Sequence, residues 1–102
     1  MPAVEAGVDG AGWATLICGY LWDCQEALGV VYGNARCPNG ESSGNPGEVY
    51  AGNYGLWQID EATWRPYFGE ERWARVLDAA ENTAMAWEIY ERNGWVAWAC
   101  HP

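Results

Sequence analysis

The stretch CPNGESSGNPGEVYAGNYGLWQID, residues 37–60, decides how the fold of this chain is interpreted. It begins as a run of Gly, Ser, Asn and Pro with no sustained hydrophobic period, and it becomes apolar and aromatic at Leu56. A structureless loop of this length is unusual inside a compact domain and tends to be functional. We therefore expect residues 33–55 to form either a long ordered loop or a short, irregular β element.

Helical patterns lie on both sides of this stretch. Asp23 is followed three residues later by Glu26, a capping-box spacing that predicts a helix ending at Gly33. Asp60 is expected to cap a short helix that begins at Glu61. Further helical segments are expected over residues 12–21, 61–66, 70–76 and 79–93, with Pro66 ending the third helix and residues 95–102 forming a short extended tail. The predicted fold class is therefore mainly α, with a long irregular or short β segment between the helices.

The composition indicates a small globular domain with unusually many aromatic rings. The chain has 102 residues, half of them hydrophobic, with eight Trp and six Tyr. A chain of this length forms a single domain with one modest core. Indole rings fill cores or stack on flat, partly apolar ligands, and eight are more than a small core readily accommodates with their N–H groups satisfied. We therefore expect some of them to line a binding groove.

The charge balance is strongly acidic, with 14 Asp and Glu against 5 Arg and a net charge of -9. Nucleic-acid binding needs a basic surface, so this class of partner is disfavoured.

No segment approaches the roughly 20 apolar residues of a transmembrane helix. The N-terminal residues lack the basic and apolar regions of a secretion signal. We expect residues 1–11 to be a flexible lead-in to a single domain over residues 12–102, with any signal removed or export achieved by another route such as phage lysis.

The four cysteines, Cys18, Cys24, Cys37 and Cys100, allow three full pairings. No Cys-x-x-Cys spacing occurs and His101 is the single histidine, so we expect no metal site. Two disulfides in an oxidising compartment are a better interpretation than four reduced thiols in the cytosol. We therefore expect an extracellular or cell-wall-associated monomer in which Cys100 staples the C-terminal tail to the body.

The acids are the candidates for chemistry, because the parts of nucleophilic triads and of metal-dependent hydrolysis are missing. A carboxyl group alone can cleave an acetal by protonating the glycosidic oxygen. Glu41 is distinctive, since its neighbours are small or uncharged and the nearest charges in sequence are Arg36 and Glu48. If the loop folds against the apolar stretch that follows, desolvation would raise the pKa of Glu41. From composition alone, a solvated loop glutamate remains the alternative.

Four motifs in order give a more specific interpretation. ESSGNP, then a tyrosine, then YGLWQI, then DAAENTAMAWEIYERNGWVAW resemble the lysozyme-like domains of the lytic transglycosylase and goose-type lysozyme group, especially the small versions of actinobacterial and phage cell-wall proteins. WDCQEALGVVY also resembles the helix that leads into the catalytic glutamate of that group. The resemblance covers about Ile17 to Cys100. It implies an α+β lysozyme-like fold with short helices around a groove, which cleaves the β-1,4 bond between N-acetylmuramic acid and N-acetylglucosamine in peptidoglycan without a cofactor.

By this resemblance, Glu41 takes the place of the general acid and base. The residues that the resemblance implies for substrate binding are Ser42, Tyr54, Gly55, Leu56, Trp57, Gln58, Asn82 and Tyr90. Gln58 would hydrogen-bond a sugar and Tyr90 would point toward the glutamate, whereas a buried structural hydrogen bond is an equally good interpretation of Asn82. Asp60 is the candidate second acid, and its alternative role is the helix cap. The core is expected to take Trp87, Trp95 and Trp98.

One departure from the family pattern bears directly on Glu41. The family helix runs straight into Glu-Ser, whereas here the seven residues NARCPNG, 34–40, stand between VVYG and ESSGNP. Position 34 is an asparagine, which cannot donate an acidic proton. We expect a loop, with Cys37 as its candidate anchor, to return Glu41 to the same place. The alternatives are a non-catalytic glycan-binding or phage structural module with a disarmed site, and a small inhibitor-like disulfide protein.

Overall fold

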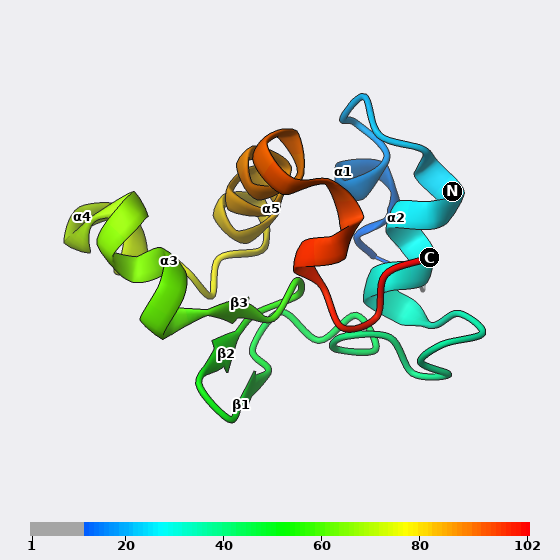
Figure 1. The fold of residues 1–102 in the computed structure, drawn as a ribbon, viewed down its shortest axis with the longest axis horizontal. Coiled ribbons are helices and arrows are strands. Elements are labelled where there is room, and N and C mark those ends of the chain that lie inside the picture. Colours follow the sequence, from blue (N-terminus) through cyan, green and yellow to red (C-terminus); the bar gives the residue numbers. More distant parts are fainter. Residues whose placement is uncertain (1–11) are drawn as a thin grey trace.

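A computed structural model describes residues 12–102, so the lead-in predicted over residues 1–11 lies outside the described part of the chain. Its elements are α1 (Ala14–Ile17), α2 (Cys24–Tyr32), β1 (Val49–Tyr50), β2 (Asn53–Tyr54), β3 (Ile59–Asp60), α3 (Glu61–Phe68), α4 (Glu70–Trp73), α5 (Ala79–Asn93) and the 3-10 helix η1 (Gly94–Ala97). Figure 1 shows α1 and α2 at one end, α3 and α4 at the other, and α5 between them, with the small sheet along one side. The predicted mixture of helices with a minor β element is confirmed.

The stretch over residues 33–55, expected to be either an ordered loop or a short β element, contains both. Residues 33–48 form an ordered loop, and β1 and β2 follow it. Together with β3 they build a three-stranded antiparallel sheet in the order β1-β2-β3. Ala51 and Gly52 join β1 to β2 with positive φ angles of 53° and 82°, as a type I′ hairpin turn requires. In the next pair of strands, Asn53 lies opposite Asp60.

The helix boundaries follow the capping residues closely. The side chain of Asp23 accepts a hydrogen bond from the N–H of Glu26, and α2 ends at Gly33. Asp60 caps α3 in the same way. α5 spans Ala79–Asn93, the range that was predicted. Carboxylates at these positions accept N–H groups that have no partner within the helix, which is why their spacing fixes where each helix begins.

Four expectations about helix bounds were wrong. α1 spans only Ala14–Ile17 of the predicted residues 12–21, and α4 ends at Trp73 rather than at residue 76. α3 continues past Pro66 to Phe68, because one missing N–H donor is tolerated in a short helix whose last residue is buried in the core. The chain after α5 is also not an extended tail, since Gly94–Ala97 forms η1, Trp98 has extended backbone angles and a turn follows at residues 99–100.

The core accommodates more indole rings than the sequence suggested. Trp57 is fully buried, and its ring centroid lies 4.7 Å from that of Trp22 and 6.2 Å from that of Trp95. Three buried indole N–H groups have acceptors: Trp22 donates to the carbonyl of Ile17, Trp57 to the hydroxyl of Thr83, and Trp98 to the carbonyl of Trp57. As expected, Trp98 is buried in the core, while Trp87 and Trp95 pack against it partly exposed.

Two disulfides close the structure, as predicted. Cys18 pairs with Cys24, six residues away, and Cys37 pairs with Cys100, 63 residues away. The second bond holds the C-terminal tail against the loop that follows α2, and the tail therefore lies beside this helix in Figure 1.

Removing the two disulfides separately should have unequal effects. In the chain-entropy model, the long Cys37–Cys100 loop stabilises the fold by about 4 kcal/mol and the short Cys18–Cys24 loop by about 2 kcal/mol. The paired substitutions Cys37→Ala with Cys100→Ala should therefore lower the free energy of unfolding more than Cys18→Ala with Cys24→Ala. Urea denaturation of both variants measures the difference. Equal losses would contradict a stapling role for the longer loop.

Candidate functional site

The loop after α2 returns the chain to the end of the helix that it left. In a continuous helix, the carbonyls of Val30 and Val31 would accept hydrogen bonds from residues 34 and 35. Here they accept from the N–H groups of Glu41 and Ser42, at 2.7 and 3.3 Å. Glu41 therefore takes the hydrogen-bonding place of residue 34, and the seven residues 34–40 form an excursion that leaves the helix and rejoins it.

The excursion has its own internal supports. The side-chain oxygen of Asn34 accepts hydrogen bonds from the N–H groups of Arg36 and Cys37, and its amide nitrogen donates to the carbonyl of Cys100 at 2.8 Å. Gly40 has a φ of 66°, and a Cβ atom there would lie 2.3 Å from the carbonyl oxygen of Val31. The return to the helix thus requires a glycine at position 40, and the disulfide from Cys37 ties the excursion to Cys100.

The carboxyl group of Glu41 is half-buried and has one fixed partner. Its Oε2 atom accepts a hydrogen bond from the N–H of Cys100 at 3.0 Å. Desolvation by burial raises the pKa of Glu41 above its ordinary value of 4.5, and the hydrogen bond from Cys100 opposes this rise without cancelling it. The group consequently keeps its proton to a higher pH than an exposed glutamate, and Oε1 remains for an incoming ligand.

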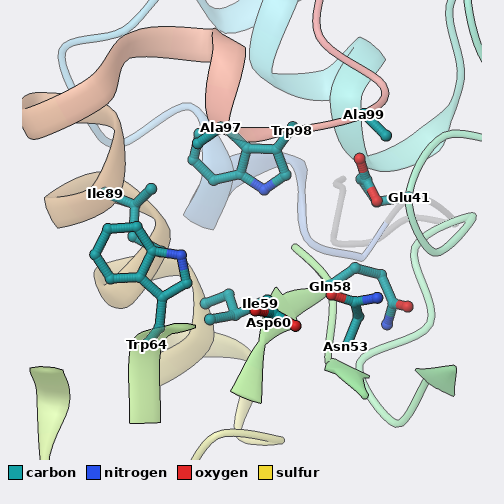
Figure 2. A pocket seen from close by; sticks show the side chains of 10 residues that line it. All are labelled: Glu41, Asn53, Gln58, Ile59, Asp60, Trp64, Ile89, Ala97, Trp98 and Ala99. Carbon is teal, nitrogen blue, oxygen red and sulfur yellow. The ribbon is translucent and has the colours of Figure 1, made fainter. Parts of the chain in front are cut away.

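Glu41 lies in the wall of a cavity of about 230 Å³ (Figure 2). The sheet, α3, α5 and the C-terminal tail all contribute to this cavity, which is lined by Glu41, Asn53, Gln58, Ile59, Asp60, Trp64, Ile89, Ala97, Trp98 and Ala99. Figure 2 shows the carboxyl of Glu41 across the opening from Gln58 and Asn53, with the indole of Trp64 at the other end. An acid with a raised pKa, two amides and two indoles thus line one small cavity.

Gln58 is held in an unusual conformation at this cavity. Its φ is 47°, a left-handed value that is uncommon for a residue other than glycine. Its amide nitrogen donates to the carbonyls of Glu48 and Gly55, at 3.1 and 3.0 Å. These bonds engage the donor end of the amide, so its oxygen is the atom left to accept a hydrogen bond. Strained backbone of this kind clusters at functional sites.

Asp60 lines the cavity and also caps α3. Its Oδ2 atom accepts hydrogen bonds from the N–H and the hydroxyl of Thr63. The capping interpretation is therefore confirmed, and one carboxylate oxygen of Asp60 is already engaged.

The structure brings Glu41, Gln58 and Asp60 together in the lining of this cavity, while the other predicted site residues do not line it and support the surrounding elements. Those residues are Ser42, Tyr54, Gly55, Leu56, Trp57, Asn82 and Tyr90. The hydroxyl of Ser42 donates to the carbonyl of Leu56, and that of Tyr54 donates to Glu61. Tyr90 packs against other rings, with its centroid 4.6 Å from that of Trp95.

Asn82 is the central residue of that supporting layer. It is fully buried, and its oxygen accepts from the N–H of Trp57 at 2.8 Å. Its nitrogen donates to the carbonyls of Tyr54 and Val76, at 2.9 and 2.8 Å. A Cβ atom on Gly55 would lie 2.3 Å from this nitrogen, so the glycine is needed for the close approach. Asn82 thereby ties α5 to the segment that carries Gln58.

Sequence reasoning missed several cavity residues. Asn53 faces the site because it lies opposite Asp60 in the pairing of β2 with β3. A strand of two residues is too short for its register to be predicted from the sequence. Trp64 follows the Asp60 cap by four residues, one helical turn, and this spacing was a usable signal. Ala97 and Ala99 reach the cavity only because the tail is held by Cys100, and no local pattern indicates that.

Replacing Asn82 should cost stability rather than only ligand binding. Asn82→Ala deprives three backbone groups of their hydrogen-bond partner, and we expect a loss of about 3 kcal/mol or more in the free energy of unfolding. Asn45→Ala, at an exposed loop position, serves as the control and should cost under about 1 kcal/mol. Chemical denaturation tests both. A small loss at Asn82 would contradict the supporting role.

The raised pKa of Glu41 also predicts a pH-dependent stability difference. Because the folded state holds this proton more tightly than the unfolded chain, the stability that it contributes is present below about pH 4.5 and is lost as pH rises through the folded pKa. Gln at this position keeps an acceptor for the N–H of Cys100 but does not titrate. The free energy of unfolding of the wild type minus that of Glu41→Gln should therefore fall as the pH rises above about 4.5. A difference that is flat or rises with pH would contradict the burial argument.

Comparisons with known proteins add no further assignment. No significant match to this chain was found among protein-family models, curated proteins or solved structures. Within residues 12–102, no helix has the length and apolar character needed to span a membrane. The candidate site therefore rests on its own geometry.

Proposed function

We propose that this domain is a peptidoglycan-cleaving glycosidase, a muramidase or lytic transglycosylase that cuts the β-1,4 bond between N-acetylmuramic acid and N-acetylglucosamine. One observation carries the proposal: the half-buried carboxyl of Glu41, with its raised pKa, lies in the wall of a cavity that is also lined by two amide side chains and two indoles. The motif order in the sequence supports the same conclusion.

Glu41 has the properties of a general acid that later becomes a base. In its protonated form, which the raised pKa favours, it donates its proton to the glycosidic oxygen, the bond from that oxygen to the muramic acid breaks, and N-acetylglucosamine leaves with a free hydroxyl. The resulting carboxylate is stabilised by the N–H of Cys100, which lies 3.0 Å from Oε2. It then accepts a proton from the attacking hydroxyl and returns to its first state.

The cavity suits one sugar unit of a longer chain. Its volume of about 230 Å³ lies below the roughly 300 to 1,000 Å³ of sites that enclose a drug-sized ligand. Trp64 offers an apolar surface to the sugar ring, while Asn53 and Gln58 offer amide groups to its hydroxyl and N-acetyl substituents. Such short-range contacts suit a chain whose net charge of -9 would repel an anionic polymer at long range.

The arrangement of elements supports a lysozyme-like fold. α2 leads to the acid, the acid is followed by a small antiparallel sheet, and α5 packs behind the segment Gly55–Gln58 through Asn82. The two disulfides support an extracellular or cell-wall location.

Asp60 bears on which nucleophile, water or the 6-hydroxyl of the muramic acid, attacks the sugar after the glycosidic bond breaks. A hydrolase needs a second carboxylate that positions water, and Asp60 is the cavity residue of that type. Its Oδ2 atom is already bound to Thr63 as a helix cap. This engagement favours the route in which Glu41 alone serves both steps and the 6-hydroxyl of the muramic acid attacks, forming an anhydro end.

The test is the cleavage of purified cell walls. Glu41→Gln should reduce the release of soluble fragments by about 100-fold or more, the range that a lost general acid produces. Glu91→Gln removes the same charge from an exposed position on α5 and should leave the rate unchanged. Mass spectrometry of the wild-type products should show anhydro-muramyl ends.

The other outcomes distinguish the alternatives. Full activity of Glu41→Gln would refute the assignment of the acid. Binding of the wild type to insoluble walls without release of fragments would instead indicate a glycan-binding module. Reducing muramyl ends in the products would assign hydrolysis, with Asp60 as the residue to test next.

A further inference from the structure

We propose that the excursion after α2 and the C-terminal tail form a second site, which binds a free carboxylate of the peptide stem carried by peptidoglycan. This inference rests on the proposed function for the identity of its ligand. The site is a cavity of about 520 Å³ lined by Asn34, Ala35, Arg36, His101 and Pro102. It shares no lining residue with the cavity of Glu41.

The charge of this second cavity sets it apart from the rest of the surface. Four of the five arginines are already engaged: Arg65, Arg72 and Arg75 pair with glutamates, and Arg92 lies over the ring of Tyr67. Within residues 12–102, Arg36 forms an ion pair with no carboxylate. In a chain of net charge -9, an arginine without a counter-charge beside an open cavity is a place for an anion.

The guanidinium group of Arg36 is oriented before any ligand arrives. Its Nε atom donates to the carbonyl of His101 at 3.0 Å, which leaves the two terminal nitrogens as a planar fork. A fork of this shape matches a carboxylate with two parallel hydrogen bonds. Nε is engaged with backbone rather than with an acid, so the positive charge remains to be neutralised.

The backbone beneath Arg36 is fixed as well. The side chain of Asn34 accepts from the N–H of Arg36 at 2.9 Å and donates to the carbonyl of Cys100, and the disulfide from Cys37 to Cys100 lies alongside. Because loop and tail are already tied together, binding an anion costs little ordering of the protein.

The position of the second cavity relative to Glu41 indicates which carboxylate it would bind. Ala99 lines the cavity of Glu41 and His101 lines the second cavity, so at most about 7 Å of backbone separates the two linings along the tail. The proposed substrate carries its peptide on the muramic acid, one partner in the bond that is cut. A glycan held at Glu41 therefore brings a peptide with free carboxylates near this tail.

The experiment uses soluble muramyl peptides and the full chain. N-acetylmuramyl-L-alanyl-D-isoglutamine has one free carboxylate, its terminal amide has none, and chitotetraose has neither peptide nor carboxylate. Calorimetry should show the acid binding at least tenfold more tightly than the amide, with NMR shift changes at the Nε–H of Arg36 and the ring of His101. Arg36→Gln should remove the tenfold preference, Arg36→Lys should retain part of it, and Arg75→Gln should retain all of it.

Equal affinity of the acid and the amide for the wild type would overturn the inference, and that comparison needs no variant to fold. If Arg36→Gln still prefers the acid over the amide tenfold, the inference is overturned as well.

Inorganic phosphate that binds at Arg36 more tightly than the muramyl peptide would assign the site to a phosphate polymer instead. Chitotetraose should bind the wild type and Arg36→Gln equally. If cleavage and chitotetraose binding both fail while the Arg36-dependent preference persists, the proposed glycosidase function is refuted and the carboxylate site stands.

Discussion

The structure depends on two backbone hydrogen bonds, those from the N–H groups of Glu41 and Ser42 to the carbonyls of Val30 and Val31. They complete the last turn of α2 with residues that lie seven positions later than a continuous helix would use. Because the carbonyls at a helix end need partners, this pairing satisfies the helix and fixes the acid in one step. The sheet, the tail and α5 then enclose a carboxyl group whose position is already set.

The elements of the fold could be predicted largely from local patterns. Asp23 and Asp60 accept N–H groups of the first turn, so their spacing fixes where two helices begin. Pro66 misled the prediction of a helix end, because its cost in a short helix is outweighed by burial of the residue two positions later. The prediction of an extended tail failed for a similar reason, because the 3-10 helix η1 allows Trp98 to enter the core.

The site was predictable only in part, since its members meet through contacts distant in sequence. Glu41 and Gln58 could be named from their motifs, and both line the cavity. The motif residues between and beyond them became structural supports instead: Asn82 holds the N–H of Trp57, and Gly55 makes room for Asn82. The hydrogen bond from Cys100 to Glu41 joins residues 59 positions apart, and no local period indicates such a contact.

The excursion over residues 34–40 separates the position of Glu41, which the helix end fixes, from the composition of the loop that precedes it. Its ends are held by the helix and its interior by Asn34, Cys37 and Gly40, so only the exposed positions 35, 36, 38 and 39 are free to change without moving Glu41. These four positions can therefore carry new side chains at the surface, while the hydrogen bonds at the helix end keep Glu41 in place. The excursion is thus a place where loop composition can be varied, by mutation or by design, without redesign of the domain.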